Sequence, residues 1–246
     1  METSIVFGRR PVLEYLRSGQ PVNRLYVLAG AEGIPRELFR IAKEREIPTV
    51  RCDRQRLDSL ARKGNHQGVA AQTASREFDS WQEILESTIY KEGPPLILAL
   101  DGVQDPGNFG ALLRTAEGAG VNGVVVTARA SCGLTPAVTR AAAGADAYIK
   151  VARVDRLDRV LSDLVKVGYQ VVAANPQAEL DYDQLDLRKA TVFVLGAEGE
   201  GLSRQVEAAC TVGVRLPLRG QVDSLNVSAT GAILLYEALR QRKKTE

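Results

Sequence analysis

Short apolar runs alternate along the chain with stretches whose apolar residues recur every three or four positions. The first pattern is typical of buried strands and the second of helices that bury one face. In the N-terminal part, strands are predicted at residues 22–28, 47–50 and 69–72, and helices at 7–16, 35–45 and 54–62. This alternation predicts a small α/β domain of about 70 residues.

The same alternation resumes near residue 96. Strands are predicted at residues 96–100, 123–127, 147–151, 169–173, 192–195 and 212–216. Helices are predicted at residues 110–120, 136–143, 156–167, 203–209 and 225–240. The last helix has an apolar stripe formed by Leu225, Ala229, Ala232, Ile233, Tyr236 and Leu239. We expect this stripe to pack on the sheet or on a second subunit.

The pattern weakens between the two regions, where Gly93-Pro94-Pro95 is a clear break and one helical turn is expected near Trp81. We therefore predict an N-terminal domain at residues 1–73, a linker at 74–93 and a second domain at 94–246. Strands that alternate with helices favour parallel pairing, so the expected fold class is α/β.

Two apolar runs, at residues 192–195 and 212–216, precede polar loops that contain glycine. Because ligands bind beyond the carboxyl ends of parallel strands, the loops at 196–201 and 220–226 are expected to line one crevice. The first loop reads G-x-x-G-x-G and carries Glu198 and Glu200, whereas a phosphate-binding turn has a different spacing. Two carboxylates suit a cationic ligand or an active-site acid, but a glycine-rich turn with solvated glutamates fits equally well.

A strong turn and helix start, Asp105-Pro-Gly-Asn108, follows the strand predicted at 96–100, and Asn108 is the expected N-cap. The buried stripe of the next helix is expected to contain Leu112, Leu113, Ala116 and Ala119. Arg114 lies nearly opposite that stripe on the helical wheel. The pattern alone therefore favours a solvated arginine.

Composition limits the chemistry. Charged residues make up 25% and apolar residues 45% of the 246 residues, and no apolar run is long enough to span a membrane. The start of the chain has no apolar signal core, so we expect a cytoplasmic protein. Cys52, Cys132 and Cys210 are far apart and His66 is the single histidine, so neither a disulfide framework nor a metal site is expected.

The charge is unevenly distributed. Residues 1–73 carry 13 Lys and Arg against 8 Asp and Glu, while the rest of the chain carries 19 against 22. Part of the positive charge gathers before residues 64–68, at Arg51, Arg54, Arg56, Arg62 and Lys63. These cations fit either phosphate contacts with RNA or a solvated helix face.

Three segments together resemble the SpoU family of the SPOUT superfamily, whose members are S-adenosylmethionine-dependent RNA ribose 2′-O-methyltransferases. The segments are residues 101–120 (from Asp101-Gly-Val-Gln-Asp-Pro-Gly-Asn108 to Arg114-Thr-Ala-Glu-Gly-Ala-Gly120), 195–202 (Leu-Gly-Ala-Glu-Gly-Glu-Gly-Leu) and 216–228 (Leu-Pro-Leu-Arg-Gly, then Ser-Leu-Asn-Val-Ser). Residues 7–14 and 65–69 are similar to the family's N-terminal substrate-binding domain, which resembles ribosomal protein L30e. The likeness thus covers nearly the whole chain.

The resemblance implies a trefoil knot near the C-terminus, a homodimer, and S-adenosylmethionine as the cofactor. It further implies a guanosine of 23S ribosomal RNA as the substrate, with transfer RNA as the alternative. The implied catalytic residues are Asn108, Arg114, Glu198, Ser224 and Asn226. The implied cofactor-binding residues are Gly196, Gly201, Leu216 and Leu225, and no metal is implied. Ala229 and Asp223 depart slightly from the family pattern.

Two other classes of protein make different predictions. A non-catalytic RNA-binding dimer of the same fold would be expected to lose Asn108, Arg114, Glu198 or Asn226, and all four are present. A nucleotide-dependent oxidoreductase would be expected to have a turn suited to phosphate in place of the acidic loop.

Overall fold

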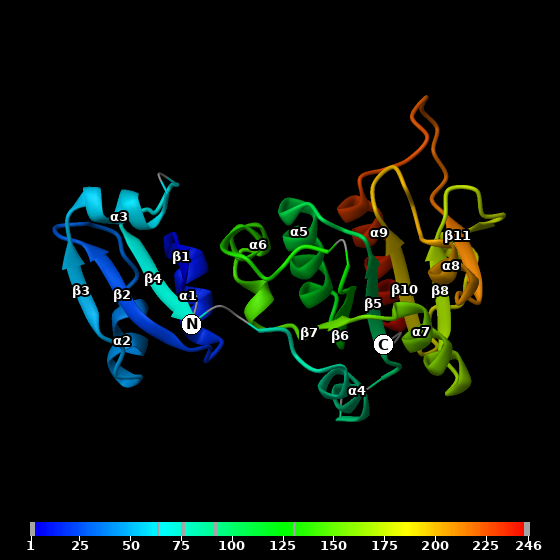
Figure 1. The fold of residues 1–246 in the computed structure, drawn as a ribbon, viewed down its shortest axis with the longest axis horizontal. Helices are drawn as coiled ribbons and strands as arrows, with labels where there is room; N and C mark the ends of the chain where they lie inside the picture. Colours follow the sequence, from blue (N-terminus) through cyan, green and yellow to red (C-terminus); the bar gives the residue numbers. More distant parts are fainter. Residues whose placement is uncertain (1–2, 63, 75–76, 91–92, 130, 244–246) are drawn as a thin grey trace. The chain divides into compact units, whose positions relative to one another are not determined.

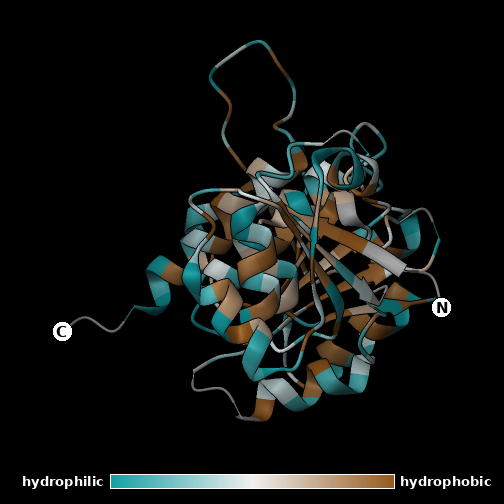
Figure 2. Cartoon of the chain, turned by 90° about the vertical axis from the view of Figure 1, so that its left-hand side faces the viewer, coloured by the Kyte–Doolittle hydropathy of each residue, from teal (hydrophilic) through white to brown (hydrophobic). Residues whose placement is uncertain are grey.

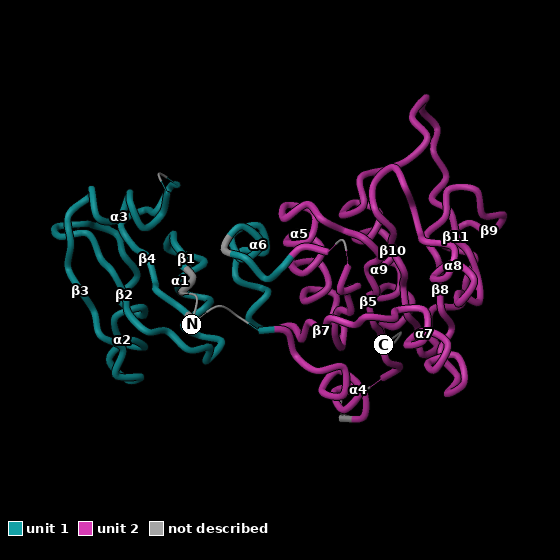
Figure 3. The backbone as a smooth tube through the Cα atoms, viewed as in Figure 1, with its two compact units in different colours: residues 1–77, 133–148 teal, residues 78–132, 149–246 magenta. Residues whose placement is uncertain are grey.

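A computed structural model describes residues 3–62, 64–74, 77–90, 93–129 and 131–243. Helices and strands alternate along the chain (Figure 1), and the α/β class predicted from the sequence is confirmed. The chain forms two compact units, one made of residues 1–77 and 133–148 and the other of residues 78–132 and 149–246 (Figure 3).

The sheet of the first unit has four strands in the order β1-β4-β2-β3. Its strands are β1 (Thr3–Phe7), β2 (Val22–Leu28), β3 (Thr49–Cys52) and β4 (Val69–Ala74). β4 is antiparallel to both β1 and β2, and β2 is parallel to β3. β1, β2 and β3 therefore run in the same direction, and their carboxyl ends lie at one edge of the sheet.

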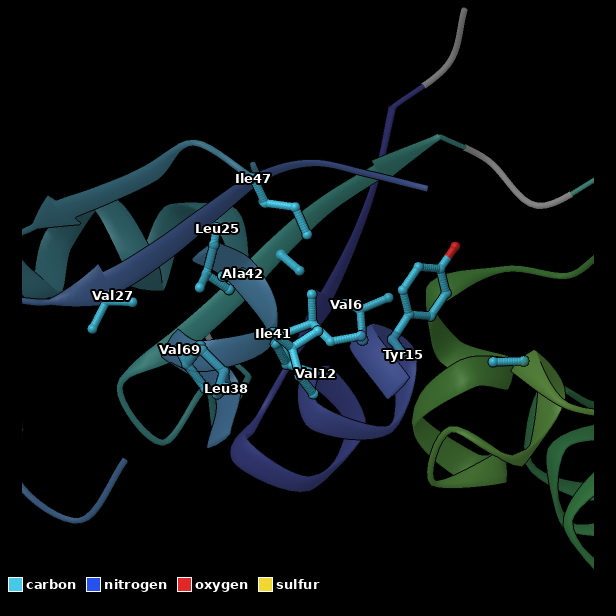
Figure 4. Close-up of a cluster of buried hydrophobic side chains, with 13 residues drawn as sticks. Val6, Val12, Tyr15, Leu25, Val27, Leu38, Ile41, Ala42, Ile47 and Val69 are labelled. Atoms are coloured by element: carbon cyan, nitrogen blue, oxygen red, sulfur yellow. The ribbon is translucent and has the colours of Figure 1, made fainter. Parts of the chain in front are cut away.

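Helices cover both faces of this sheet. On one face α1 (Arg9–Arg17) and α2 (Arg36–Glu44) enclose a core that includes Val12, Leu25 and Leu38 (Figure 4). On the other face α3 (Arg54–Leu60) packs Leu57 against Tyr26 and Ala70. β1 was not predicted from the sequence, although its residues Thr-Ser-Ile-Val-Phe favour a strand.

The segment at 133–148 belongs to the first unit, although the sequence-based boundaries place it in the second domain. It forms α6 (Pro136–Ala142) and the short 3₁₀ helix η1 (Ala145–Ala147), and the Arg140 guanidinium lies 4.6 Å from the centre of the Phe7 ring. The strand predicted at 147–151 is wrong: Ala147 ends η1 and packs in the first core, and β7 begins only at Val151. Ala143 and Gly144 adopt left-handed conformations that turn the chain before η1.

The second unit contains a seven-stranded sheet in the order β7-β6-β5-β10-β8-β11-β9, in which every pairing is parallel. The strands are β5 (Leu96–Asp101), β6 (Gly123–Thr127), β7 (Val151–Val154), β8 (Gln170–Ala174), β9 (Leu180–Asp181), β10 (Thr191–Gly196) and β11 (Val212–Arg215). The central strands are buried on both sides, as their continuous apolar runs predict.

Helices of this unit pack in two groups. One core joins the sheet to α4 (Trp81–Tyr90), α7 (Leu157–Lys166) and α8 (Arg204–Ala208). The other group consists of α5 (Pro106–Gly118) and α9 (Val227–Arg242), which contact each other and, through α9, strand β10. Helices of the chain carry both hydrophobic and hydrophilic residues (Figure 2). α4 falls in the predicted linker, but Ile84 is fully buried in the second core.

The apolar stripe predicted for the last helix is not the side that packs within its own unit, and the alternative, packing on a second subunit, stays a prediction. The buried side of α9 contains Val227, Gly231, Leu234, Leu235 and Ala238, while Tyr236 is 52% exposed. Gly231 explains this orientation, because a side chain there would collide with Leu112 of α5 and press on Leu195 of β10. Because Gly231 has no Cβ, α9 can lie close to α5 and β10 on this side. A hydrophobicity pattern does not identify this side as buried, since glycine is not counted as strongly apolar.

Candidate active site

A pocket of about 550 Å³ lies where three neighbouring strands of the second unit end. It is lined by the residues that follow β8, β10 and β11 and by the first turns of α9. β8 lies between β10 and β11 in the sheet, so loops that are distant in sequence meet at one edge. The volume is in the range of small-molecule sites, and the position is where open parallel sheets bind ligands.

Glycines determine the shape of the loop after β10. The Ala197 and Gly201 main chains exchange two hydrogen bonds, of 3.1 and 2.9 Å, which close residues 197–201 into a tight turn. Gly199 and Gly201 have positive φ angles, of 83° and 71°. A Cβ on Gly196 would collide with the main chain of Gly201 and Leu202. The G-x-x-G-x-G spacing is therefore needed for the turn itself.

Asn226 connects the three sequence motifs. Its Oδ1 accepts from the backbone N–H of Ser228 at 2.9 Å and so caps α9. The fixed amide then points Nδ2 at Asn108 Oδ1, 2.9 Å away, and at Glu198 Oε1, 2.7 Å away. Glu198 Oε1 also accepts from the backbone N–H of Val227 at 3.4 Å, at the helix end that favours a carboxylate. Asn108, Glu198 and Asn226 thus form one hydrogen-bonded group.

The loop that carries Asn108 is fixed differently from the prediction. The N-cap of α5 is Asp105, whose carboxylate accepts from the Asn108 backbone N–H at 2.7 Å, so Asn108 lies inside the first turn. This arrangement leaves the Asn108 side chain free to face Asn226. Asp101, at the end of β5, accepts from the Ser203 backbone N–H at 2.8 Å and holds the end of the acidic loop.

The third motif borders the pocket from the segment between β11 and α9, which projects from the sheet in Figure 1. Leu216, Ser224 and Leu225 line the pocket, and the last two are exposed. Of the candidate residues named from the sequence, the structure brings seven to the pocket wall: Gly196, Glu198, Gly201, Leu216, Ser224, Leu225 and Asn226. Asn108 joins them through Asn226.

Arg114 is not part of this wall. It lies on α5 with an exposed side chain, as the helical wheel predicts. Within the described residues its guanidinium has no hydrogen bond or ion pair. Its role therefore stays a prediction.

Sequence reasoning missed one wall of the pocket. Residues 174–177, which follow β8, and Glu207 of α8 line it, and Asn175 donates to Glu207 Oε1 at 3.1 Å. The strand-end rule could have found Asn175, because a polar Asn-Pro pair follows the strand predicted at 169–173. What was missing was the strand order that places β8 between β10 and β11.

Other chemistry has little support in the described residues. No group of three or more His, Cys, Asp or Glu side chains among them could hold a metal ion, and no helix there is long and apolar enough to span a membrane. The three cysteines are free thiols. Burial raises the pKa of the Cys210 thiol to about 12, so this thiol is not an activated nucleophile.

Comparison with known proteins agrees with the site. A family described as SpoU rRNA Methylase matches residues 95–236, and one described as RNA 2'-O ribose methyltransferase substrate binding matches residues 5–78. A Staphylococcus aureus protein assigned to the TrmH family of tRNA/rRNA methyltransferases is 35% identical, over 98% of each chain.

Solved structures agree in fold. An RNA 2'-O ribose methyltransferase is 30% identical, with a TM-score of 0.78 over 98% of this chain and 89% of that one. An AdoMet-bound rRNA methyltransferase of Sinorhizobium meliloti is 25% identical, with a TM-score of 0.80 over 97% and 87%. A substrate-binding domain precedes a methylase domain in this chain, and the three motifs gather at one pocket. The chain therefore belongs to the SpoU rRNA methylase family of RNA methyltransferases.

Proposed function

We propose that this protein transfers a methyl group from S-adenosylmethionine to the ribose 2′-hydroxyl of a guanosine in 23S ribosomal RNA. The observation that carries the proposal is the hydrogen-bonded group of Asn108, Glu198 and Asn226, which joins all three motifs beside one pocket. The Sinorhizobium meliloti enzyme of the same fold is bound to AdoMet.

The pocket residues fit this cofactor. Glu198, Glu200, Glu207 and Asp223 give the wall a negative character that suits a positively charged ligand, and Arg215 is already paired with Asp181 at 2.7 Å. The tight turn at 196–201 and the residues near Leu216 and Leu225 would hold the cofactor, partly through their main chain. When bound, S-adenosylmethionine supplies an electrophilic methyl group on a sulfonium.

The chain's own residues would orient the acceptor. Asn226 fixes Glu198 through one carboxylate oxygen, Oε1, and leaves Oε2 without a hydrogen bond in the described chain. The Asn108 side-chain NH₂ is likewise unused, because only its Oδ1 is bonded. These two groups and the exposed Ser224 hydroxyl can position a ribose by hydrogen bonds.

Arg114 is the proposed electrostatic catalyst. Its exposed guanidinium is available to a bound RNA, but a guanidinium does not give up its proton in proteins. We therefore assign it to stabilising charge on the ribose oxygen, with Glu198 or an RNA phosphate as proton acceptor.

Ribosomal RNA is the preferred substrate because the matching family is described as an rRNA methylase family. Transfer RNA is the second candidate, since the Staphylococcus aureus relative is named for both RNAs. Mapping 2′-O-methyl sites in both RNAs after deletion of the gene decides between them: loss of one ribosomal guanosine modification supports the proposal, and loss only in transfer RNA overturns it.

The proposal includes a homodimer, the predicted knot and a cytoplasmic location. The outer side of α9 supports the dimer, because Ala229 and Tyr236 are exposed and a second copy would cover them. The meeting of residues 196–201 with 224–226 at one pocket supports the knot. Light scattering of the purified protein tests the dimer, and a monomer at micromolar concentration would contradict it.

Cofactor binding should need no metal. Calorimetry with S-adenosylmethionine in the presence of EDTA is expected to show binding. Binding that disappears with EDTA, or that is absent at millimolar cofactor, would contradict this part of the proposal.

A further inference from the structure

One edge of the first unit gathers exposed arginines. β1, β2 and β3 run in the same direction and lead into α1, α2 and α3, so all three helices begin at the carboxyl edge of the strands. β4 runs the opposite way, so the loop before it, at 61–68, also lies at this edge. We call the exposed cations there the basic edge, which consists of Arg10, Arg36, Arg54 and Arg62.

These arginines have almost no partners within the described chain. The side chains of Arg10, Arg36 and Arg62 make no hydrogen bond or ion pair there. The Arg54 side chain is 80% exposed and approaches Asp58 only to 3.9 Å. The nearby acid Asp53 is occupied as the N-cap of α3 through the Arg56 backbone N–H, at 2.8 Å. Three of the four guanidinium groups of the basic edge are therefore unpaired within the described residues, and the fourth, Arg54, is paired at long distance.

The basic edge does not serve the stability of the helices. α1 begins with Arg9 and Arg10 and has no acidic residue in its first turn, although the start of a helix favours acids. The opposite edge behaves as stability requires: Lys43 lies in the last turn of α2, and the Arg45 guanidinium donates to the Leu16, Gly19 and Gln20 carbonyls. Cations at that edge interact favourably with the carbonyl groups at helix C-termini. Three of the four cations of the basic edge stand instead at helix N-termini, where the helix dipole disfavours positive charge.

The loops of the basic edge are held in place. Arg9 Nε donates to the Gln67 carbonyl at 3.0 Å, and a second guanidinium nitrogen donates to the Glu32 carbonyl at 2.6 Å. The Arg9 backbone N–H donates to Gln67 Oε1 at 3.0 Å. His66 is buried, and its Nδ1 accepts from the Gly68 backbone N–H at 3.0 Å. Three loops are thus cross-linked, so the exposed arginines project from a rigid base.

From these observations we infer that the basic edge of the first unit binds the phosphate backbone of the RNA substrate. Unneutralised arginines on a rigid surface match phosphate oxygens in charge and geometry. The inference rests on the proposed function, which makes RNA the substrate, and adds the surface that contacts it. The clustering of cations near residues 51–63 of the sequence does not select this edge. Strand direction selects it, because it brings Arg10 and Arg36 to the same edge as Arg54 and Arg62.

The test compares pairs of substitutions that remove the same charge. The full-length pairs Arg10→Gln with Arg36→Gln, and Arg54→Gln with Arg62→Gln, weaken the basic edge. The control pair is Arg24→Gln with Lys43→Gln, two exposed cations away from that edge. Binding is measured without cofactor to a 23S rRNA transcript and to unfractionated tRNA, over a range of KCl concentrations.

Each basic-edge pair should weaken RNA binding by about tenfold near 0.1 M KCl. It should also reduce the slope of log K against log [KCl] by between about one and two, since each lost phosphate contact removes roughly 0.7 to 0.9. The control pair should change affinity less than about twofold. Thermal stability should not fall in the Arg10 and Arg36 variants, because their cations oppose the helix dipole.

The outcomes separate this inference from the proposed activity. If the basic-edge pairs bind RNA as well as the control pair while the wild type methylates RNA, the inference is overturned and the activity stands. If the wild type binds RNA through this edge but methylates none, the inference holds and the activity fails. Equal loss in all three pairs would show a general charge effect and would also overturn the inference.

Discussion

The two units place polar loops at the same position in their sheets but give them opposite charge. In the first unit the carboxyl edge of the strands carries Arg10, Arg36, Arg54 and Arg62. In the second, the corresponding edge opens into a pocket lined by Glu198, Glu200, Glu207 and Asp223. Strand ends leave loop side chains and main-chain groups available in both cases.

Topology therefore places these loops at one edge of each sheet, and side-chain charge sets which kind of ligand each edge suits. An anionic polymer suits the first edge, and a small cation suits the second. The edges also differ in how they are fixed. Arg9 cross-links the basic edge by hydrogen bonds to two loops, whereas glycine geometry closes the acidic turn. The following predictions test this comparison in order of expected effect.

Removal of Arg114 should have the largest effect, because this exposed cation is proposed to act on the reacting ribose. Arg114→Ala should lower single-turnover methylation by roughly 10²-fold or more, the size of a lost transition-state donor. Folding and cofactor affinity should not change, since the side chain is exposed and without partners in the described chain. Arg114→Lys should recover only part of the rate. Near wild-type turnover in the alanine variant would return Arg114 to the solvated surface.

Gly196→Ala should reduce cofactor affinity by at least about tenfold, as measured by calorimetry. The new Cβ would collide with the Gly201 and Leu202 main chain, so the acidic turn could not close. The free energy of unfolding should fall by about 1–3 kcal/mol, the usual cost of overpacking. The matched control is Gly220→Ala, where a Cβ meets nothing within 4 Å. Equal effects at both positions would show that turn closure is not the cause.

Two substitutions of Asn226 should distinguish its role as the cap of α9 from its role in holding Asn108 and Glu198 together. Asn226→Ala removes the α9 cap and should cost about 1 kcal/mol of stability, together with several-fold in cofactor affinity or turnover. Asn226→Ser can still cap but cannot reach both Asn108 and Glu198, so it should lose function with little loss of stability.

The first unit provides the control for that experiment. Asp53 caps α3 in the same way, through the Arg56 backbone N–H. Asp53→Ala should therefore destabilise by a similar amount, about 1 kcal/mol, and leave cofactor binding unchanged. If the Asp53 variant impaired cofactor binding as much as Asn226→Ala, general destabilisation would explain both results.

The smallest effect is expected for Glu200, an exposed carboxylate at the pocket. Glu200→Gln should lower affinity for S-adenosylmethionine by about two- to fivefold, in the range of exposed charge pairs. Affinity for the demethylated product, which lacks the sulfonium charge, should change less. An equal loss for both ligands would mean that Glu200 acts through packing or loop shape, and that the acidic character of this edge does not select the ligand.

Most elements could be predicted from the sequence, because alternation of apolar and polar residues is a local signal. β2 and β6 have the predicted limits, and several helices begin or end within one or two residues of them. One prediction failed where a contact distant in sequence decides the conformation. Ala147 ends a 3₁₀ helix and packs in the core of the first unit, so no strand forms at 147–151.

The candidate site shows the same division. By itself the sequence determined which residues are candidates for the site, because Glu198, Ser224 and Asn226 stand in loops next to glycines and strong apolar runs. Only the tertiary structure decided the geometry of the site. Strand order places residues 174–177 on the pocket wall. Asn226 both caps α9 and donates a hydrogen bond to Glu198. Periodicity reports which residues avoid water, whereas the partner that buries or bonds each one depends on long-range packing. The orientation of α9 is an example: Gly231 allows a close helix contact, but the sequence does not show that Leu112 of α5 is the residue it faces.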